Sequence, residues 1–367
     1  MSSRVYSVFV KLDVLFVFVV AVAGGCSSGG SEASSAGGTD TATGGSITAS
    51  GGTTGSLGTS GTVASCVALQ CPSSVASSSD GTNLVAASNG CAKSGYICTS
   101  SDSGATWTQT IAPLQKWHSV ASSSDGAKLV AVAYGDYIYA SADSGATWTQ
   151  RAVPAYWNSV ASSSDGTNLV AATNLGIYTS ADSGATWTYA NAVGGVSVAS
   201  SSDGTKLVKA SWGDVLTSSD SGATWTRTTA NPDADNSGFY WVSVASSSDG
   251  TKLVAVSEGC VCTSSDSGAT WTHNCDLSTS SDNRSWWQFA ASSSDGTKLV
   301  AAANSGIYTS ADSGATWTQT AAPQQSWISV ASSSDGTKLV ATGNTPPSAV
   351  GYIYTSSDSG ATWTQRL

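Results

Sequence analysis

The sequence predicts an all-β fold, a seven-bladed β-propeller of four-stranded antiparallel blades, on the basis of three observations. A unit of roughly forty residues recurs seven times within the 367 residues, and self-similarity at such a period is typical of propellers and other repeat folds. Each unit holds four short runs rich in β-branched and aromatic residues, separated by turn residues. Glutamate occurs only at Glu32 and Glu258, and no stretch has the apolar period of a helix.

The last unit shows the predicted elements in order. Its strands are expected at 329–332, 338–341, 352–356 and 361–365. A turn of sequence Asp-Gly-Thr joins the first two strands, because glycine adopts the positive φ that a tight hairpin needs. A second turn, of sequence Ser-x-Asp-Ser-Gly-Ala-Thr-Trp, joins the last two. Four strands make one blade, so seven units predict seven blades.

The second turn is intact in every unit and has a local structural use. Its carboxylate can accept backbone N–H groups of its own turn, its glycine permits the tight path, and its tryptophan can pack back over the turn. Seven equivalent aspartates are therefore expected to be structural rather than catalytic. They are Asp102, Asp143, Asp182, Asp220, Asp266, Asp312 and Asp358.

This turn resembles the Asp-box (BNR) repeat of sialidases, sortilin-type receptors, xyloglucan-type glycoside hydrolases and photosystem II assembly-factor propellers. The resemblance covers residues 65–367 and implies the propeller architecture. Enzymes and non-enzymes share the motif, so the resemblance implies fold rather than activity. The last unit ends at Leu367, so ring closure is expected to rest on packing of the first unit against the last, unless residues 63–69 add to a sheet edge.

The N-terminus, residues 1–25, has the order of a secretory signal: a basic start, an apolar run and then small residues. Two processing sites remain open. Ala21-Val22-Ala23 suits an ordinary signal peptidase, whereas Ala23-Gly24-Gly25-Cys26 resembles a bacterial lipobox, which would place lipidation on Cys26.

Residues 26–62 are rich in Ser, Gly and Thr, which predicts a flexible linker or a lipoprotein tether, and residues 63–367 are predicted to form the propeller. The protein is therefore expected to be secreted or extracytoplasmic, and to meet a membrane only through an N-terminal lipid anchor.

Seven cysteines remain apart from Cys26, and export makes disulfides plausible for them. The pairings compatible with neighbouring strands are Cys91 with Cys98, and Cys275 with either Cys260 or Cys262. A zinc site is the alternative for the second cluster, with His273 as the fourth ligand.

The predicted propeller has two unlike faces. The turns between first and second and between third and fourth strands share one face, the turn face, and are nearly invariant among the units. The turns between second and third strands and the connections between units lie on the other face, the variable-loop face, and differ in length and content. A localised function is expected on the variable-loop face.

One long connection on that face imitates half of a calcium loop. Asp233, Asp235 and Ser237 offer oxygen atoms at alternate positions, followed by a glycine, but no glutamate completes the set. No cofactor is expected unless this loop binds calcium, and a merely polar loop is the alternative.

A tryptophan precedes the predicted first strand of five units, at Trp117, Trp157, Trp241, Trp286 and Trp327. If these side chains face the channel mouth, they form an aromatic ring suited to stacking on sugars. Further candidate binding residues beside them are His118, Tyr156, Tyr240 and Trp287. The alternative interpretation is that these tryptophans pack between adjacent blades.

Composition and residue content argue against several activities. A net charge of −10 leaves no basic stripe for nucleic acid. A sialidase needs an arginine cluster and a Tyr/Glu pair, yet Glu258 is the one glutamate after the N-terminal region. We expect no enzyme but a non-catalytic propeller that binds a cell-surface glycan or protein on its variable-loop face. A glycoside hydrolase of the Asp-box propeller type, or an assembly factor of the photosystem type, is the alternative.

Overall fold

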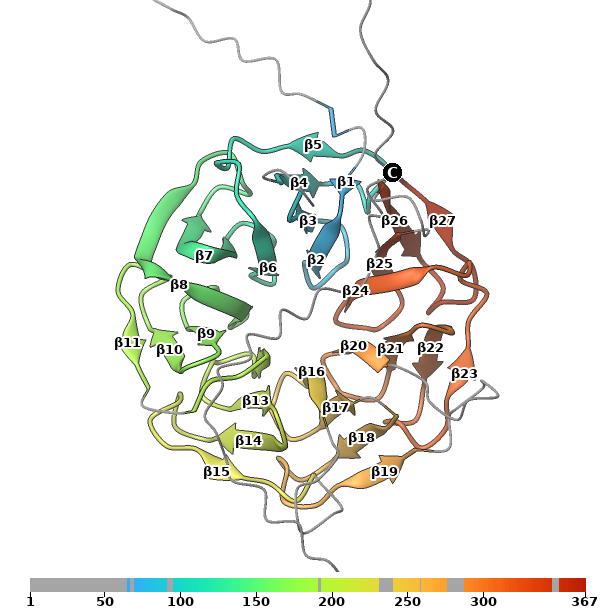
Figure 1. Cartoon of the computed structure of the whole chain (residues 1–367). Coiled ribbons are helices and arrows are strands. Elements are labelled where there is room, and N and C mark those ends of the chain that lie inside the picture. The colour runs from blue at the N-terminus through green and yellow to red at the C-terminus, as the bar shows by residue number, and fades with distance from the viewer. Residues whose placement is uncertain are drawn as a thin grey trace, which may run out of the picture. The chain divides into compact units, whose positions relative to one another are not determined.

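The computed structural model describes residues 65–66, 69–90, 95–190, 193–230, 240–257, 259–275, 287–344 and 350–367. All of them belong to the unit that runs from Thr53 to Leu367. The regular elements of this part of the chain are β-strands, arranged as antiparallel sheets in a ring (Figure 1), so the predicted all-β propeller is confirmed. Over these residues, no helix long and apolar enough to cross a membrane is found. The predicted signal peptide (1–25), the predicted linker (26–62) and Cys26 lie outside the described residues.

The strands follow the repeats in order, from the centre of the ring to its rim. The first repeat forms β2 Pro72–Ser77, β3 Leu84–Ser88, β4 Ile97–Ser100 and β5 Thr108–Gln109. The second and third form β6 Trp117–Ser122, β7 Leu129–Ser141, β8 Thr149–Ser162, β9 Leu169–Thr173, β10 Ile177–Ser180 and β11 Thr188–Tyr189. The fourth forms β12 Ser197–Ser200, β13 Leu207–Ser211, β14 Asp214–Ser218 and β15 Thr226–Arg227. The fifth forms β16 Trp241–Ser246, β17 Leu253–Ser257, β18 Val261–Ser264 and β19 Thr272–Asn274. The sixth forms β20 Trp287–Ser292, β21 Leu299–Ala303, β22 Gly306–Ser310 and β23 Thr318–Gln319. The seventh forms β24 Ser326–Ser332, β25 Leu339–Asn344, β26 Val350–Ser356 and β27 Thr364–Gln365, and it is joined by β1 Leu69–Gln70.

The predicted count of seven blades is wrong. The described strands form six hydrogen-bonded sheets, hence six blades, of which one is six-stranded. The cause is β8, whose start pairs with β7 of the second repeat and whose end pairs with β9 of the third. The connection between these repeats continues as part of β8 despite a register shift and a φ of 55° at Ala152. Its Ala155 and Tyr156 pair with Asp136 and Tyr134 of β7, so no separate loop lies between the two repeats.

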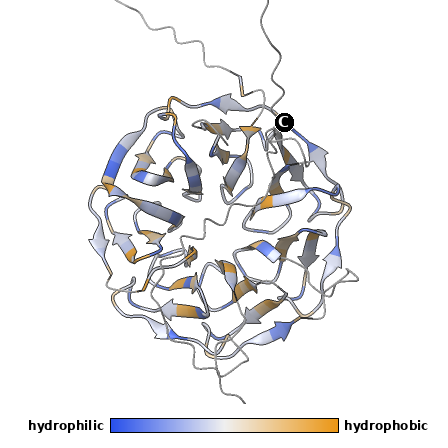
Figure 2. Cartoon of the chain, in the orientation of Figure 1, coloured by the Kyte–Doolittle hydropathy of each residue, from blue (hydrophilic) through white to orange (hydrophobic). Residues whose placement is uncertain are grey.

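The core lies between successive repeats. The middle strands β3, β9, β13, β17 and β21 are buried along their whole length. The rim strands β11, β15, β23 and β27 are exposed Thr-x pairs, and Figure 2 shows the rim on the hydrophilic side of the scale. Each hydrophobic cluster joins one repeat to the next; Val85 and Ile97, for instance, pack with Trp117 and Val120. Alanine at the strand centres lets neighbouring sheets approach closely, and the tryptophans fill the remaining space.

A closed ring of backbone hydrogen bonds joins the repeats on the turn face. One serine of each Ser-Ser-Asp-Gly turn donates its N–H to the carbonyl of the equivalent serine in the next repeat, at 2.7–2.8 Å. The ring runs through Ser79, Ser124, Ser164, Ser202, Ser248, Ser294 and Ser334, and returns from Ser334 to Ser79. Every one of these serines therefore donates once and accepts once.

A strand from before the first repeat completes the closure. In β1, Leu69 pairs with Gly351 and Gln70 with Val350, both in β26 of the last repeat. Leu69 is fully buried in the cluster that joins the first and last repeats. Of the two modes of closure expected from the sequence, the structure therefore has the added edge strand.

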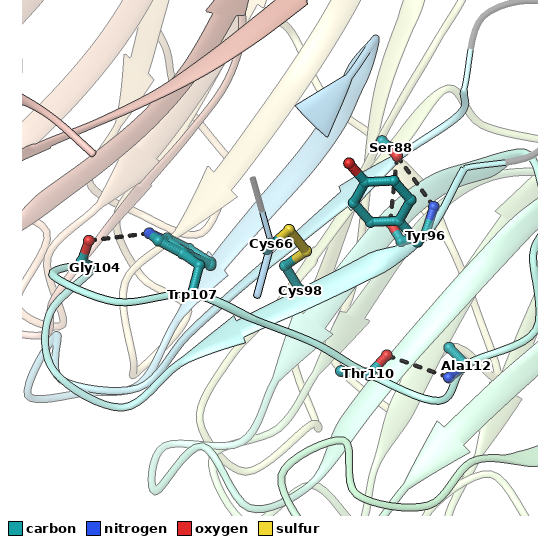
Figure 3. The surroundings of a disulfide bond; sticks show 8 residues. All are labelled: Cys66, Ser88, Tyr96, Cys98, Gly104, Trp107, Thr110 and Ala112. Carbon is teal, nitrogen blue, oxygen red and sulfur yellow. Dashed lines mark hydrogen bonds between the residues drawn. A yellow bond between two sulfur atoms is a disulfide. The ribbon is translucent and has the colours of Figure 1, made fainter. Parts of the chain in front are cut away.

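Two repeats lack a tryptophan at the start of the innermost strand, and other groups pack in that region. In the first repeat, a disulfide between Cys66 and Cys98 is buried beside Trp107 (Figure 3). This pairing corrects the predicted bond between Cys91 and Cys98. In the fourth repeat, the fully buried Lys209 places its Nζ 5.4 Å from the ring centroid of Trp225 and donates a hydrogen bond to the carbonyl of Val193. Desolvation lowers the pKa of Lys209 to about 8.

Candidate functional site on the variable-loop face

The predicted ring of tryptophans does not line a channel mouth. Trp117, Trp157, Trp241, Trp287 and Trp327 are at most 1% exposed. Four of them, Trp117, Trp157, Trp287 and Trp327, each have an edge contact with a tyrosine of the same repeat and a tilted contact with the tryptophan of the Asp-Ser-Gly turn. For Trp117 the partners are Tyr139 at 5.2 Å and Trp148 at 6.4 Å. The sugar-stacking interpretation is therefore wrong for these five residues, and their position is that of core packing.

The register corrects one member of this set. Trp287 pairs with Ala303 as Trp117 pairs with Ala133, so Trp287 rather than Trp286 is the equivalent tryptophan of the sixth repeat. Trp286 itself lies outside the described residues.

The remaining candidates are at the surface, where His118, Tyr134 and Tyr156 form a row of rings. Tyr134 and Tyr156 are 41% and 60% exposed, with ring centroids 5.0 Å apart. His118, also exposed, lies 6.1 Å from the Tyr134 ring at 31°. Its Nδ1 is 2.7 Å from the carbonyl oxygen of Asn158, so Nδ1 carries the proton and Nε2 stays available. Surrounding protein atoms desolvate the imidazole and lower its pKa, although solvent still reaches the ring.

A second aromatic pair lies two repeats further on. Trp212 and Tyr240 are 62% and 55% exposed, and an antiparallel bridge joins their backbones. Tyr240 and Tyr156 were candidates from the sequence, whereas Tyr134 and Trp212 were missed. A signal for both was present: each precedes Gly-Asp in the turn between the second and third strands of its repeat.

The exposed large apolar side chains lie on this face. Among the residues that the structure describes, all of them lie in or next to the turns between second and third strands or the connections between repeats. They are Ile111, Leu114, Tyr134, Val153, Tyr156, Leu175, Tyr189, Val193, Trp212 and Tyr240. They fall between residues 111 and 240, so one sector of the variable-loop face carries them.

Only two carboxylates of the described residues lie outside the repeated turns, and both are on this face. Asp136 Oδ1 accepts the backbone N–H of Tyr137 at 2.7 Å. Asp214 forms an ion pair with Arg227, Nε to Oδ1, at 2.5 Å. These carboxylates follow Tyr134-Gly135 and Trp212-Gly213, so each aromatic pair has an acid in the same turn.

The turn-face aspartates are held inside their own turns. Asp102 accepts the N–H of Thr106 at 2.8 Å and its hydroxyl at 2.6 Å, and Ser100 donates to the same carboxylate. The indole N–H of Trp107 donates to the carbonyl of Gly104 at 3.0 Å. The same bonds recur around Asp143, Asp182, Asp220, Asp266, Asp312 and Asp358. Hydrogen bonds from threonine lower the pKa of these carboxyls, to about 2 at Asp182, which favours the ionised acceptor.

The structure contradicts the predicted zinc site. Cys260 and Cys275 form a disulfide, so the zinc set with Cys262 and His273 loses two of its ligands and is wrong. Cys262 is a buried free thiol whose Sγ lies 3.1 Å from His273 Nδ1, and burial raises its pKa to about 12.

The calcium candidates Asp233, Asp235 and Ser237 lie outside the described residues. Within the described ranges, no three His, Cys, Asp or Glu side chains converge on a metal position.

Comparison with known proteins supports the fold. No protein-family model and no curated protein matches the chain. Among solved structures, it is similar to YCF48 from Cyanidioschyzon merolae, with a TM-score of 0.57 and 14% identity over 80% of this chain and 96% of that one. YCF48 bound to D1 peptide gives a TM-score of 0.56 and 14% identity over 81% and 94%. The GH74 xyloglucanase from Xanthomonas campestris gives 0.54 and 16% over 79% of this chain and 60% of the enzyme. The chain shares the β-propeller fold of these proteins.

Proposed function

We propose that this chain is a non-catalytic, secreted or surface-tethered propeller that binds a glycan or protein ligand on its variable-loop face. The observation that carries the proposal is the one-sided distribution of exposed large apolar side chains, which gather between residues 111 and 240. The turn face is instead built from Ser, Thr, Asp and Gly. A concentration of exposed apolar groups on one face is typical of an interaction surface.

The polar groups of this face support binding rather than turnover. A glycosidase needs a protonated acid and a second, free carboxylate across a cleft. Asp136 already accepts a backbone N–H, and Asp214 is paired with Arg227. The buried thiol of Cys262, with its pKa near 12, is also a poor nucleophile.

A peptide is a specific second ligand class, because one propeller of similar fold is known bound to a D1 peptide. The likeness to a xyloglucanase makes glycoside hydrolysis the enzymatic alternative.

The test uses the purified chain against a glycan array, a peptide library and a panel of chromogenic glycosides. Leu175→Ser and Trp212→Ala should weaken whichever ligand binds. Ser357→Ala on the turn face is the matched control, because Ala142, Ala181 and Ala311 occupy the equivalent position in other repeats. Turnover of a glycoside, or binding that both face variants leave intact, would overturn the proposal.

A further inference from the structure

Two repeats share the same departure from the common sequence. At the turn between second and third strands, the second repeat has Tyr134-Gly135-Asp136 and the fourth has Trp212-Gly213-Asp214. The glycines have φ of 75° and 89°, so the two turns have similar conformations at this position. The equivalent position of the aromatic residue is polar in the other repeats, which have Asn89, Asn174, Glu258, Asn304 and Asn344.

The backbone of each turn aromatic is paired with that of a second aromatic residue from the connection to the following repeat. Tyr134 is the register partner of Tyr156, and Trp212 is bridged to Tyr240. Tyr156 and Tyr240 are themselves equivalent, because each directly precedes a buried tryptophan that begins an innermost strand. A pair of exposed aromatic residues on paired backbone segments therefore occurs twice, two repeats apart on one face.

The surroundings of these rings match the chemistry of a pyranose. A sugar presents an apolar C–H face, which stacks on an open aromatic ring, and a rim of hydroxyls, which hydrogen-bond to planar polar groups. Asp136 and Asp214 follow the rings in the same turns, Arg227 is paired with the second acid, and His118 leaves its Nε2 available beside Tyr134. A peptide hot spot instead needs a concave apolar pocket, whereas these rings are 41–62% exposed.

We infer that the variable-loop face carries two equivalent aromatic subsites for a neutral glycan, one at Tyr134 and Tyr156 and the other at Trp212 and Tyr240. The inference rests on the proposed function and names its ligand class. The glycan is neutral because the chain has a net charge of −10 and each subsite holds a carboxylate, which together repel anionic saccharides. An oligosaccharide long enough to span both subsites should bind more tightly than a short one of the same series, because the second contact is then intramolecular.

The experiment measures binding of short and long members of several neutral oligosaccharide series to the full chain by calorimetry. Two double variants, Tyr134→Ala/Tyr156→Ala and Trp212→Ala/Tyr240→Ala, remove one subsite each. Each should weaken the long oligosaccharide by about tenfold or more and abolish the advantage of length. Thr318→Ala, at an exposed position of the rim strand β23 and outside the exposed apolar set of the variable-loop face, is the control and should bind as wild type. Melting curves establish that the variants are folded.

The outcomes separate this inference from the proposed function. Equal binding by wild type and by both double variants overturns the two subsites. If no neutral oligosaccharide binds, but a peptide or protein binds and Leu175→Ser weakens it, the ligand class is wrong while the proposed function stands. If no ligand responds to any substitution on this face, both fail.

Discussion

Replacing Trp117 with alanine should cost stability rather than ligand affinity. The indole is fully buried between the first and second repeats, with Tyr139 and Trp148 at its ring. Deleting such a side chain leaves a cavity and costs about 3–5 kcal/mol of unfolding free energy. For a cooperative unit of roughly 300 residues, with an unfolding entropy of about 2.1 cal/mol/K per residue, the melting midpoint should fall by about 5–8 °C.

Calorimetric melting and guanidinium titration measure the loss, with Trp117→Phe as the graded comparison. The indole Nε1 has no hydrogen-bond partner, so the change to phenylalanine removes side-chain volume but no hydrogen bond. It should lower the unfolding free energy by about 1–2 kcal/mol. Tyr156→Ala is the control for an exposed ring and should change stability by less than about 0.5 kcal/mol. An unchanged midpoint for Trp117→Ala, together with lost ligand binding, would refute the assignment of this tryptophan to the core.

Three further predictions follow from other parts of the fold. Hydrogen bonds lower the pKa of Asp80 and Asp335 to about 2 from an ordinary 3.8, so their stabilisation is complete above about pH 4 and is lost as the pH falls towards 2. Melting temperatures measured from pH 5 to 2 should therefore fall, and a flat profile would contradict the geometry of these turns. The buried Cys262 thiol, with its pKa near 12, should resist Ellman's reagent in the native protein and react in guanidinium, whereas rapid native labelling would show that it is accessible. Leu69→Ala should lower the unfolding free energy by about 2–4 kcal/mol, because this residue is buried where the ring closes; an unchanged denaturation curve would remove β1 from the closure.

The repeated part of the fold was predictable because its signals are local. Turn glycines, alternation of small and apolar residues, and the Asp-Ser-Gly turns fix the strands of each repeat. The blade count failed at residues 151–156, where the connection looked like a loop but continues as β8. Its pairing with Tyr134 and Asp136 is a tertiary contact that no local pattern in the sequence reports.

The candidate site was less predictable. A tryptophan repeated at the same blade position is compatible both with an exposed binding ring and with packing between blades. The burial of Trp117 and Trp157 shows that these residues pack between blades. In the sixth repeat two adjacent tryptophans made the register ambiguous by one residue, and the pairing with Ala303 resolves it. Tyr134 and Trp212 were not predicted, because the repeated aromatic pattern lies before the first strands, whereas these two residues are single departures in the turns between second and third strands.

The ring of serine hydrogen bonds has a consequence for how the gene can change. Every serine donates one hydrogen bond to the next repeat and accepts one from the previous repeat, so the ring has no terminal donor or acceptor. An open solenoid gains or loses a terminal repeat at the cost of one interface. In this protein, an inserted or deleted unit would either leave one donor and one acceptor unmatched or, if the ring closed again, change the angle at every junction. The closed ring therefore opposes changes in the number of repeats, whereas the loops of the variable-loop face can differ between repeats without breaking it.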